Sequence, residues 1–209
     1  MTAKEEDVLM SENLIKKGLV IDKLLDSLIV TKGVNQNNLI VGDKNAVLVA
    51  ARILAYGPEY TVEVFNPNDN EQKIKHTFDL TKCEFKELKD GVDYSDNVFD
   101  FETPISKNKL KFRLLTGNEE SLMTKELEKS KKYGYDTDIT TRLRYTIIEV
   151  DGDNKQETIT SFSQNMLARD SVALRNYITE ISPDIDLTSE IEIGGETVSV
   201  SIPLTVEFF

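Results

Sequence analysis

Histidine and cysteine are the side chains that most often carry nucleophilic or metal chemistry, and each occurs once here, as His76 and Cys83. A Ser–His–Asp or Cys–His site would have to use His76, and its separation from Cys83 in the sequence does not exclude this. A single cysteine cannot form a cysteine-rich zinc site. Because Ile74, His76 and Phe78 alternate with Lys75 and Thr77 in a strand-like pattern, we expect structural roles for both His76 and Cys83.

Other patterns of chemical residues are weak. Asp151-Gly152-Asp153-Asn154 resembles the start of a calcium loop, but Phe162 stands at the twelfth position, where a glutamate would close that loop. Phosphate-binding and dinucleotide-binding glycine motifs are absent, and nothing selects a catalytic pair among the 37 acidic residues. The sequence therefore predicts a protein that is not an enzyme, with no cofactor, metal or small-molecule substrate.

Two groups of basic residues are candidates for a binding surface. The first group alternates with Leu110, Phe112 and Leu114, which gives a predicted strand one charged face and one apolar face. Either the charged face is solvated, or it binds an acidic protein such as the acidic C-terminal region of another copy. The second group leaves the same alternatives open. The candidates are Lys107, Lys109, Lys111 and Arg113 in the first group, and Arg142 and Arg144 in the second.

The chain is acidic, with a formal net charge of −12 over 209 residues. This balance disfavours binding to nucleic acid and to anionic membranes. No Lys or Arg follows Arg175, so the negative charge is concentrated toward the C-terminus. The N-terminal residues lack a signal-peptide pattern, and no apolar run approaches the roughly 20 residues of a membrane span. A lone cysteine fits a reducing compartment, so we expect a protein that is made and used in solution.

Apolar spacing and capping residues predict several helices. Residues 46–56 carry one charge, Arg52, and are typical of a helix buried on nearly all sides, capped by Asp43 and ended by Gly57. Arg52 then needs a carboxylate partner or a route to the surface. Residues 139–150 fit either a helix or a strand, and Asp138 as an N-cap favours the helix. Further helices are predicted at residues 11–30, 118–132, 161–169 and 170–181.

Alternating apolar and polar residues predict strands. Residues 60–65 and 73–80 form one expected hairpin, around a turn at 66–70. Gly194-Gly195 marks a second hairpin at 191–200, which places Ile191 opposite Val198. Single strands are expected at residues 82–87, 99–103, 109–115, 157–160 and 205–209.

These elements predict an α+β fold in which a helical layer packs on antiparallel strands and hairpins, with a C-terminal β-hairpin followed by a terminal strand. We expect one domain over residues 1–209, in which residues 60–115 could form a β-rich lobe. The terminal strand ends on Phe208 and Phe209. Large interfaces need an apolar centre within a polar rim, so this pair is a candidate partner anchor. The alternative is that both rings close the protein's own core.

Seven segments, taken in order, carry a family resemblance. They are Gly42-Asp43-Lys44, the helix into Arg52, Tyr56-Gly57-Pro58-Glu59-Tyr60, Phe78-Asp79-Leu80, Thr141-Arg142-Leu143-Arg144-Tyr145, Asp151-Gly152, and Ile202-Pro203 with Phe208-Phe209. In this order and spacing the chain resembles the T4-type bacteriophage baseplate protein family, the group that includes the baseplate hub subunit. The likeness covers roughly residue 11 to the end, and no single segment is specific. Some members carry Cys-x-x-Cys where this chain has Asn66-Pro67-Asn68-Asp69, so a metal is not implied here.

The resemblance implies a non-enzymatic structural component of a contractile phage tail baseplate, in the hub region, that works through protein–protein interfaces. Such a protein is assembled in the host cytoplasm and stays in the virion. The alternative is a baseplate hub assembly chaperone that is absent from the mature virion. In either case the implied partners are other phage tail and baseplate proteins, together with further copies of this chain.

Overall fold

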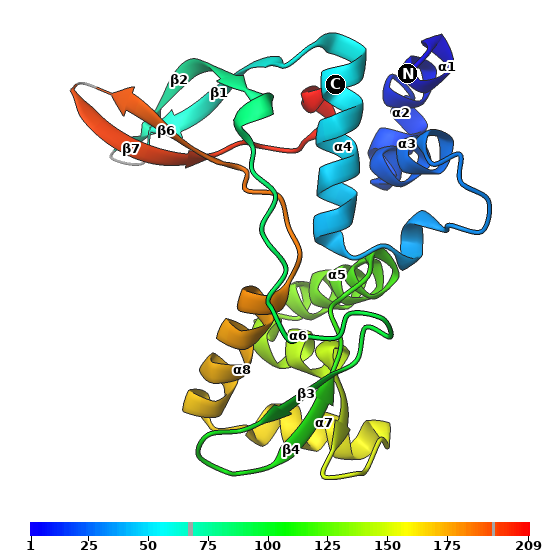
Figure 1. Cartoon of the computed structure of the whole chain (residues 1–209), viewed down its shortest axis with the longest axis vertical. Coiled ribbons are helices and arrows are strands. Elements are labelled where there is room, and N and C mark those ends of the chain that lie inside the picture. Colours follow the sequence, from blue (N-terminus) through cyan, green and yellow to red (C-terminus); the bar gives the residue numbers. More distant parts are fainter. Residues whose placement is uncertain (67–68, 194) are drawn as a thin grey trace. The chain divides into compact units, whose positions relative to one another are not determined.

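The computed structural model describes residues 1–66, 69–193 and 195–209. Its fold is α+β, as predicted, with helices and small antiparallel sheets (Figure 1). The chain divides into two compact units. Unit 1 holds Met1–Gln36, Gly42–Lys86 and Pro183–Phe209, and unit 2 holds Asn37–Val41 and Glu87–Ser182. The expectation of one domain over residues 1–209 stays a prediction. The boundary after Lys86 assigns β1 (Glu59–Asn66) and β2 (Asp69–Asp79) to unit 1 and β3 (Phe99–Glu102) and β4 (Lys109–Phe112) to unit 2.

Unit 1 begins with three short helices. The single helix predicted at residues 11–30 is wrong, because the chain turns at Gly18, whose φ is 65°. The N–H of Leu19 donates to the carbonyl of Leu14, which closes the helix end with the left-handed residue that glycine adopts without strain. The helical segments up to residue 56 are α1 (Ala3–Leu9), α2 (Glu12–Lys17), α3 (Val20–Leu28), the 3-10 helix η1 (Gln36–Asn38) and α4 (Val41–Tyr56).

Helix α4 is longer than predicted and is anchored by a close backbone contact. It begins before Asp43, so this residue lies in the first turn and is not the N-cap, whereas Gly57 ends the helix as expected with a φ of 87°. At Gly42 a Cβ atom would lie 2.0 Å from the carbonyl oxygen of Pro183. Only glycine permits this approach, which fixes the start of α4 against the returning chain.

Arg52 is bound in a way that the sequence did not indicate. Its guanidinium donates to the carbonyl oxygens of Gly57 at 3.4 Å and Glu59 at 3.2 Å, and it lies 4.9 Å from the ring centre of Tyr56. Of the two expected alternatives, a carboxylate partner or a route to the surface, the structure favours the second: the side chain reaches an exposed backbone carbonyl just beyond the helix C-terminus, where a positive charge is favourable.

Two hairpins complete unit 1. β1 (Glu59–Asn66) pairs with β2 (Asp69–Asp79), and β6 (Thr188–Ile193) pairs with β7 (Glu196–Ser201), with Ile191 opposite Val198 as predicted. The predicted turns include residues 67–68 and 194, which lie outside the described residues. The strand predicted at 82–87 is wrong: η2 (Leu80–Lys82) is a 3-10 helix, and beyond it Phe85 makes an isolated bridge to Ile185. The predicted terminal strand is also wrong, because η3 (Val206–Phe208) is a 3-10 helix.

In Figure 1, α4 lies between α1–α3 and the two hairpins. Two apolar clusters of unit 1 each include a residue of α4. On one side, Leu48 packs with α1 and α3, and on the other Val49 packs with both hairpins. Phe209 contacts both clusters. The core of unit 1 is thus assembled from segments that lie far apart in the sequence.

Unit 2 contains a three-stranded antiparallel sheet with the strand order β3-β4-β5. The ambiguous residues 139–150 form both elements, since α6 passes directly into β5. The strand predicted at 157–160 is wrong, because these residues lie in α7. The elements are β3 (Phe99–Glu102), β4 (Lys109–Phe112), α5 (Gly117–Lys132), α6 (Asp138–Thr146), β5 (Ile147–Val150), α7 (Gln156–Asn165) and α8 (Ala168–Ile181). Phe112 and Leu174 are fully buried in the core between the sheet and α8.

Candidate interaction surfaces

The basic residues around β4 face acidic residues of unit 2. Lys111 lies 2.9 Å from the Asp100 carboxylate, and Lys107, which precedes the strand in a loop at a φ of 59°, lies 3.8 Å from Glu102. Both pairs are well exposed to solvent, so each adds little stability. They nevertheless neutralise much of the positive face that the alternating pattern predicted.

Lys109 is held through its backbone. Its N–H donates to the carboxylate of Asp151 at 2.8 Å, and the amide of Asn108 donates to the same carboxylate at 2.7 Å. These hydrogen bonds lower the pKa of Asp151, and the hydrogen bond from Asn108 has the largest effect. The Asp151-Gly152 turn, which resembled a calcium loop in sequence, therefore ties the end of β5 to the start of β4.

The three arginine candidates converge on helix α5. Arg113 lies 3.3 Å from Glu119, Arg142 lies 3.9 Å from Glu120, and Arg144 contacts Glu126. The hydroxyl of Tyr145 also donates to Glu126, at 3.1 Å. Among the residues of α5 only Met123 is buried, so the helix has little apolar surface with which to attach. The arginines therefore orient α5 on unit 2.

The electrostatics of α5 agree with this role. The hydrogen bond from Arg144 lowers the pKa of Glu126, and the partial burial of this carboxylate opposes that effect. Burial would raise the pKa of Glu119, but hydrogen bonds from Thr116 and the charge of Arg113 outweigh it and lower this pKa. Both glutamates therefore keep their charge, and both ion pairs persist, at neutral pH.

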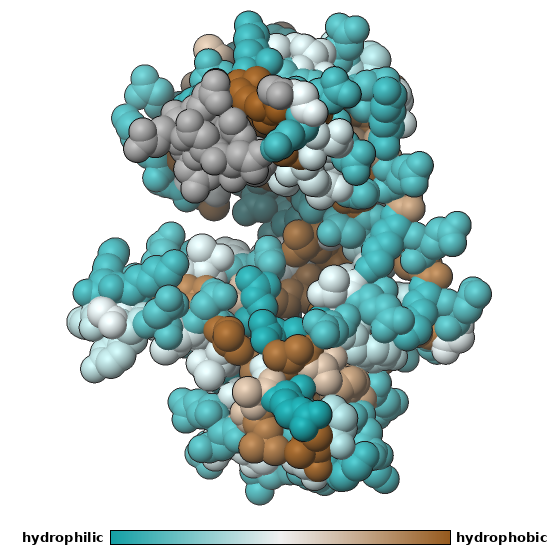
Figure 2. All heavy atoms as spheres, turned by 90° about the vertical axis from the view of Figure 1, so that its left-hand side faces the viewer, coloured by the Kyte–Doolittle hydropathy of each residue, from teal (hydrophilic) through white to brown (hydrophobic). Residues whose placement is uncertain are grey.

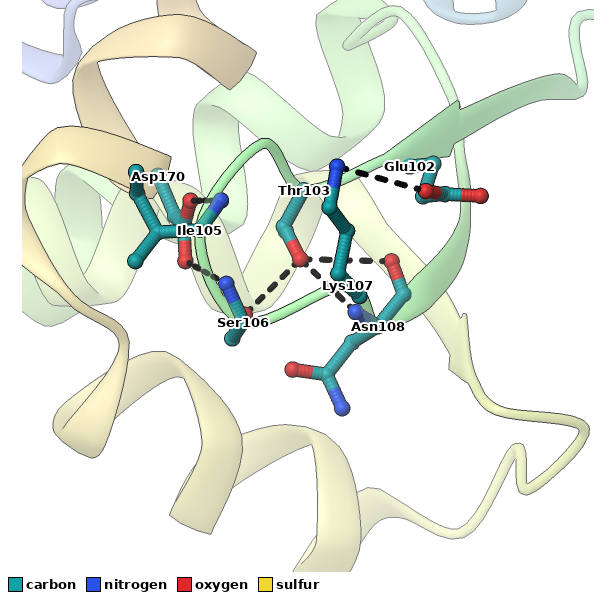
Figure 3. A network of polar contacts seen from close by, with 7 residues as sticks. All are labelled: Glu102, Thr103, Ile105, Ser106, Lys107, Asn108 and Asp170. Atoms are coloured by element: carbon teal, nitrogen blue, oxygen red, sulfur yellow. Dashed lines mark hydrogen bonds and ion pairs between the residues drawn. The ribbon is translucent and has the colours of Figure 1, made fainter.

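A buried carboxylate holds the loop between β3 and β4 (Figure 3). Asp170, at the start of α8, accepts the N–H groups of Ile105 at 2.8 Å and of Ser106 at 3.0 Å. Thr103 is also fully buried, and its hydroxyl accepts the N–H of Asn108 at 2.8 Å. Burial would raise the pKa of Asp170, but these donors outweigh it and lower the pKa. The loop that carries Lys107 is therefore fixed to the α8 helix.

The C-terminal aromatic pair lies against the core of unit 1. Phe208 is 1% exposed, and its ring meets Tyr60 edge-on with centroids 4.8 Å apart. Phe209 is half-buried and lies 5.3 Å from Phe208. Of the two alternatives left open by the sequence, this geometry favours the one in which the rings close the protein's own core.

His76 and Cys83 share a pocket of about 170 Å³ in unit 1, together with Asp79 and Glu190. Burial, reinforced by the nearby charges of Asp186 and Asp79, raises the pKa of Cys83. A nucleophilic cysteine needs the opposite shift. The His76 ring packs edge-on against Phe78, with centroids 4.7 Å apart. The pocket thus places the two residues together without activating the thiol.

The described part of the chain contains no cluster of three or more His, Cys, Asp or Glu residues that could hold a metal ion. Over the same residues, no helix is long and apolar enough to cross a membrane. The chain matches no protein-family model, and no curated protein or solved structure matches it significantly. The resemblance to baseplate proteins therefore depends on the seven sequence segments alone.

Exposed apolar side chains supply surface that the sequence did not single out. On the face drawn in Figure 2, hydrophobic atoms gather in unit 2, at the bottom of the view, among hydrophilic ones. Exposed apolar residues of this unit include Ile105, Leu167 and Val172, which are 45%, 49% and 45% exposed. In unit 1, Leu54 of α4 is 85% exposed. Apolar spacing predicts that such residues are buried, so their exposure could be found only in the structure.

Proposed function

We propose that this chain is a non-enzymatic structural subunit of a contractile phage tail baseplate, located in the hub region and acting through protein–protein interfaces. The observation that carries the proposal is the ordered series of seven segments from Gly42 to Phe209. Its partners are other tail and baseplate proteins, and the subunit stays in the virion after assembly in the host cytoplasm.

The positions of these segments in the fold support the proposal. Gly42 is the point of closest approach to Pro183, Arg52 binds the carbonyls beyond α4, and Phe208 packs on Tyr60. Asp151 joins two strands of unit 2 through the N–H of Lys109. The segments that carry the resemblance thus include residues on which this fold depends.

Quantitative mass spectrometry of purified virions tests the proposal. We expect the chain at a fixed ratio to other baseplate proteins, and we expect it to remain with the baseplate when sheath and tube are removed. If the chain is needed for tail assembly but is absent from virions, the chaperone alternative replaces the structural one. If tails assemble normally without the chain, both are wrong.

A substitution of His76 tests the proposal that the protein is not an enzyme. The substitution His76→Ala removes the only histidine. We expect normal tails and normal infectivity. Particles that assemble normally but cannot infect would point to a catalytic role for His76.

A further inference from the structure

The surface of unit 2 around the start of α8 lacks the negative charge that dominates the rest of the chain. The chain has 37 acidic residues, yet between Glu157 and Glu180 the only one is Asp170, which is fully buried. The carboxylate of Glu180 lies 2.8 Å from the Lys89 ammonium group and is neutralised by it. Residues 158–179, all of which the structure describes, therefore expose no carboxylate to solvent.

Two arginines give this surface a positive charge. Arg169 is exposed and Arg175 is half-buried. In the part of the chain that the structure describes, neither guanidinium has a carboxylate within ion-pair distance, whereas the arginines discussed above pair with glutamates of α5. Arg175 donates to the carbonyl of Ser171 in its own helix at 3.4 Å, and most of its five N–H donors face no such acceptor. The two side chains are therefore able to bind a carboxylate from another molecule.

Exposed apolar side chains lie between and beside the arginines. Val172 is three residues from both Arg169 and Arg175, and residues at this spacing are neighbours on a helix surface. Leu167 directly precedes α8, and Ile105 lies in the β3–β4 loop that Asp170 holds against this helix. In Figure 2 the hydrophobic atoms at the bottom of the view lie directly beside hydrophilic ones. Apolar side chains together with arginine are the composition of a protein–protein interface.

The loop that contributes Ile105 is ordered before any partner binds. Its N–H donates to the Asp170 carboxylate at 2.8 Å, and Figure 3 shows the two residues side by side. In the same loop Lys107 has a φ of 59°, in a region that residues other than glycine rarely adopt. Such strained residues persist where the surrounding structure fixes them, and they are frequent at binding sites. A loop that is already ordered loses little conformational entropy on binding.

We propose that this surface, formed by Ile105, Leu167, Arg169, Val172 and Arg175, binds an acidic segment of a partner protein. Carboxylates of the segment pair with the two guanidinium groups, which can each bind a carboxylate through two parallel hydrogen bonds. Aliphatic side chains of the same segment cover Val172 and its apolar neighbours. The proposal rests on the proposed function for the class of partner, a protein, and on the structure for the chemistry of the contact.

The composition of this surface favours a protein over other anionic partners. Proteins that bind single-stranded nucleic acid stack the bases on aromatic side chains, and the exposed apolar residues here are aliphatic. Lipid-binding surfaces use about four to eight clustered basic residues. A second copy would bring another net charge of −12. A short acidic segment is affected mainly by the arginines next to it, because physiological salt screens charges beyond about 8 Å.

Selection from a random peptide library displayed on yeast, with the purified full chain as the target, tests the proposal. We expect the selected peptides to combine acidic with aliphatic residues. Arg169→Glu should weaken their binding at least about tenfold, because attraction becomes repulsion. Val172→Ser should weaken it by about threefold to tenfold through the loss of apolar contact. Both variants should keep the wild-type melting temperature, since both positions are exposed and serine and valine have similar helix propensities.

Two variants of the same unit are matched controls. Lys125→Glu makes the same change of charge at an exposed position of α5, and Ile139→Ser removes an aliphatic side chain that is 49% exposed on α6. Both should bind the selected peptides as the wild type does. Selected peptides without acidic residues, or equal weakening by Arg169→Glu and Lys125→Glu, would overturn the proposal.

Further measurements identify a different occupant. If no peptide is selected, and mixed-sequence single-stranded DNA or vesicles of anionic lipid bind the wild type but not Arg169→Glu, the partner is not a protein and the proposal is wrong. It is also wrong if sedimentation equilibrium shows self-association that Arg169→Glu abolishes, because the occupant is then a second copy. None of these results changes the ratio of the chain to other proteins in virions, so this proposal and the proposed function fail separately.

Discussion

The two units of this chain attach their outer elements in different ways. In unit 1 the helices and hairpins meet on α4 through apolar side chains, and the C-terminal segment adds Phe208 to that core. In unit 2 an apolar core supports the sheet, but α5 and the β3–β4 loop are held by charged groups. Burial of apolar surface responds little to pH and salt, whereas ion pairs and buried carboxylates respond to both. The two units should therefore fail under different conditions.

The largest expected effect is in unit 1, whose elements meet through apolar side chains. Phe208→Ala should lower the free energy of unfolding of unit 1 by about 3–5 kcal/mol, because it leaves a cavity against Tyr60. Hydrogen exchange resolved by residue would measure this separately for each unit. Phe85→Ala is the control: Phe85 is 70% exposed in the same unit, and its loss should cost less than about 1 kcal/mol. Unchanged stability with failed assembly would instead make Phe208 a partner anchor.

A smaller loss of stability, with a distinct pH dependence, is expected in unit 2 for Asp170→Asn. The pKa of Asp170 is lowered in the folded chain, so the unfolded chain takes up the proton first as the pH falls. Its stabilisation is thus fully present above the ordinary aspartate range, about pH 4, and is lost as the pH falls through the folded value.

The N–H groups of Ile105 and Ser106 report on this carboxylate directly. Their hydrogen exchange should be faster in Asp170→Asn than in the wild type at neutral pH, and the difference should shrink in acid. Asp136→Asn, at an exposed position of the same unit, is the control and should leave both amides unchanged. A difference that stays constant down to pH 2 would contradict the assigned role of the charge.

The smallest effect is expected for Glu126→Gln, which removes the charge that Arg144 contacts. We expect α5 to open more readily by about 1 kcal/mol or less, as is usual for partly exposed pairs. Raised salt should reduce the protection of α5 amides in the wild type and have less effect in the variant. Glu128→Gln, on an exposed position of the same helix, should behave like the wild type. If both variants open equally, the arginines do not hold α5.

Local patterns predicted the parts of the fold that depend on local forces. The alternation around Val62 and His76 and the glycines near residue 194 predicted both hairpins of unit 1, and charge order predicted α5. Errors arose where one residue or a distant contact decides the conformation. Gly18 breaks the predicted first helix, and residues 139–150 change from helix to strand at Ile147. Division into two units depends on long-range packing, which periodicity does not reveal.

The sequence indicated which residues could form the candidate surfaces, but not which residues surround them in the fold. The sequence indicated Arg142 and Arg144, but it could not indicate that Glu120 and Glu126 of a separate helix face them. Asp170 gave no signal, because an aspartate near a helix start is common and its role depends on a loop more than sixty residues away. The acidic residues in the first turn of α5, considered together with the three arginines elsewhere in the sequence, were the only available hint.

The division of the chain also sets an order of events during synthesis. Lys86 and Asp184 are joined by a hydrogen bond of 2.9 Å between the Lys86 N–H and the Asp184 carbonyl, so unit 1 is closed only when both sides of the intervening segment are present. Residues 87–182 leave the ribosome after residues 1–86 but before residues 183–209, so unit 2 is complete while unit 1 still lacks its last segment. The apolar residues of β1, β2 and α4 must wait, uncovered, for β6, β7 and Phe208. We therefore expect the nascent chain to need protection from aggregation until residue 208 emerges. A chain truncated after residue 182 should contain a folded unit 2 and an incomplete, aggregation-prone unit 1.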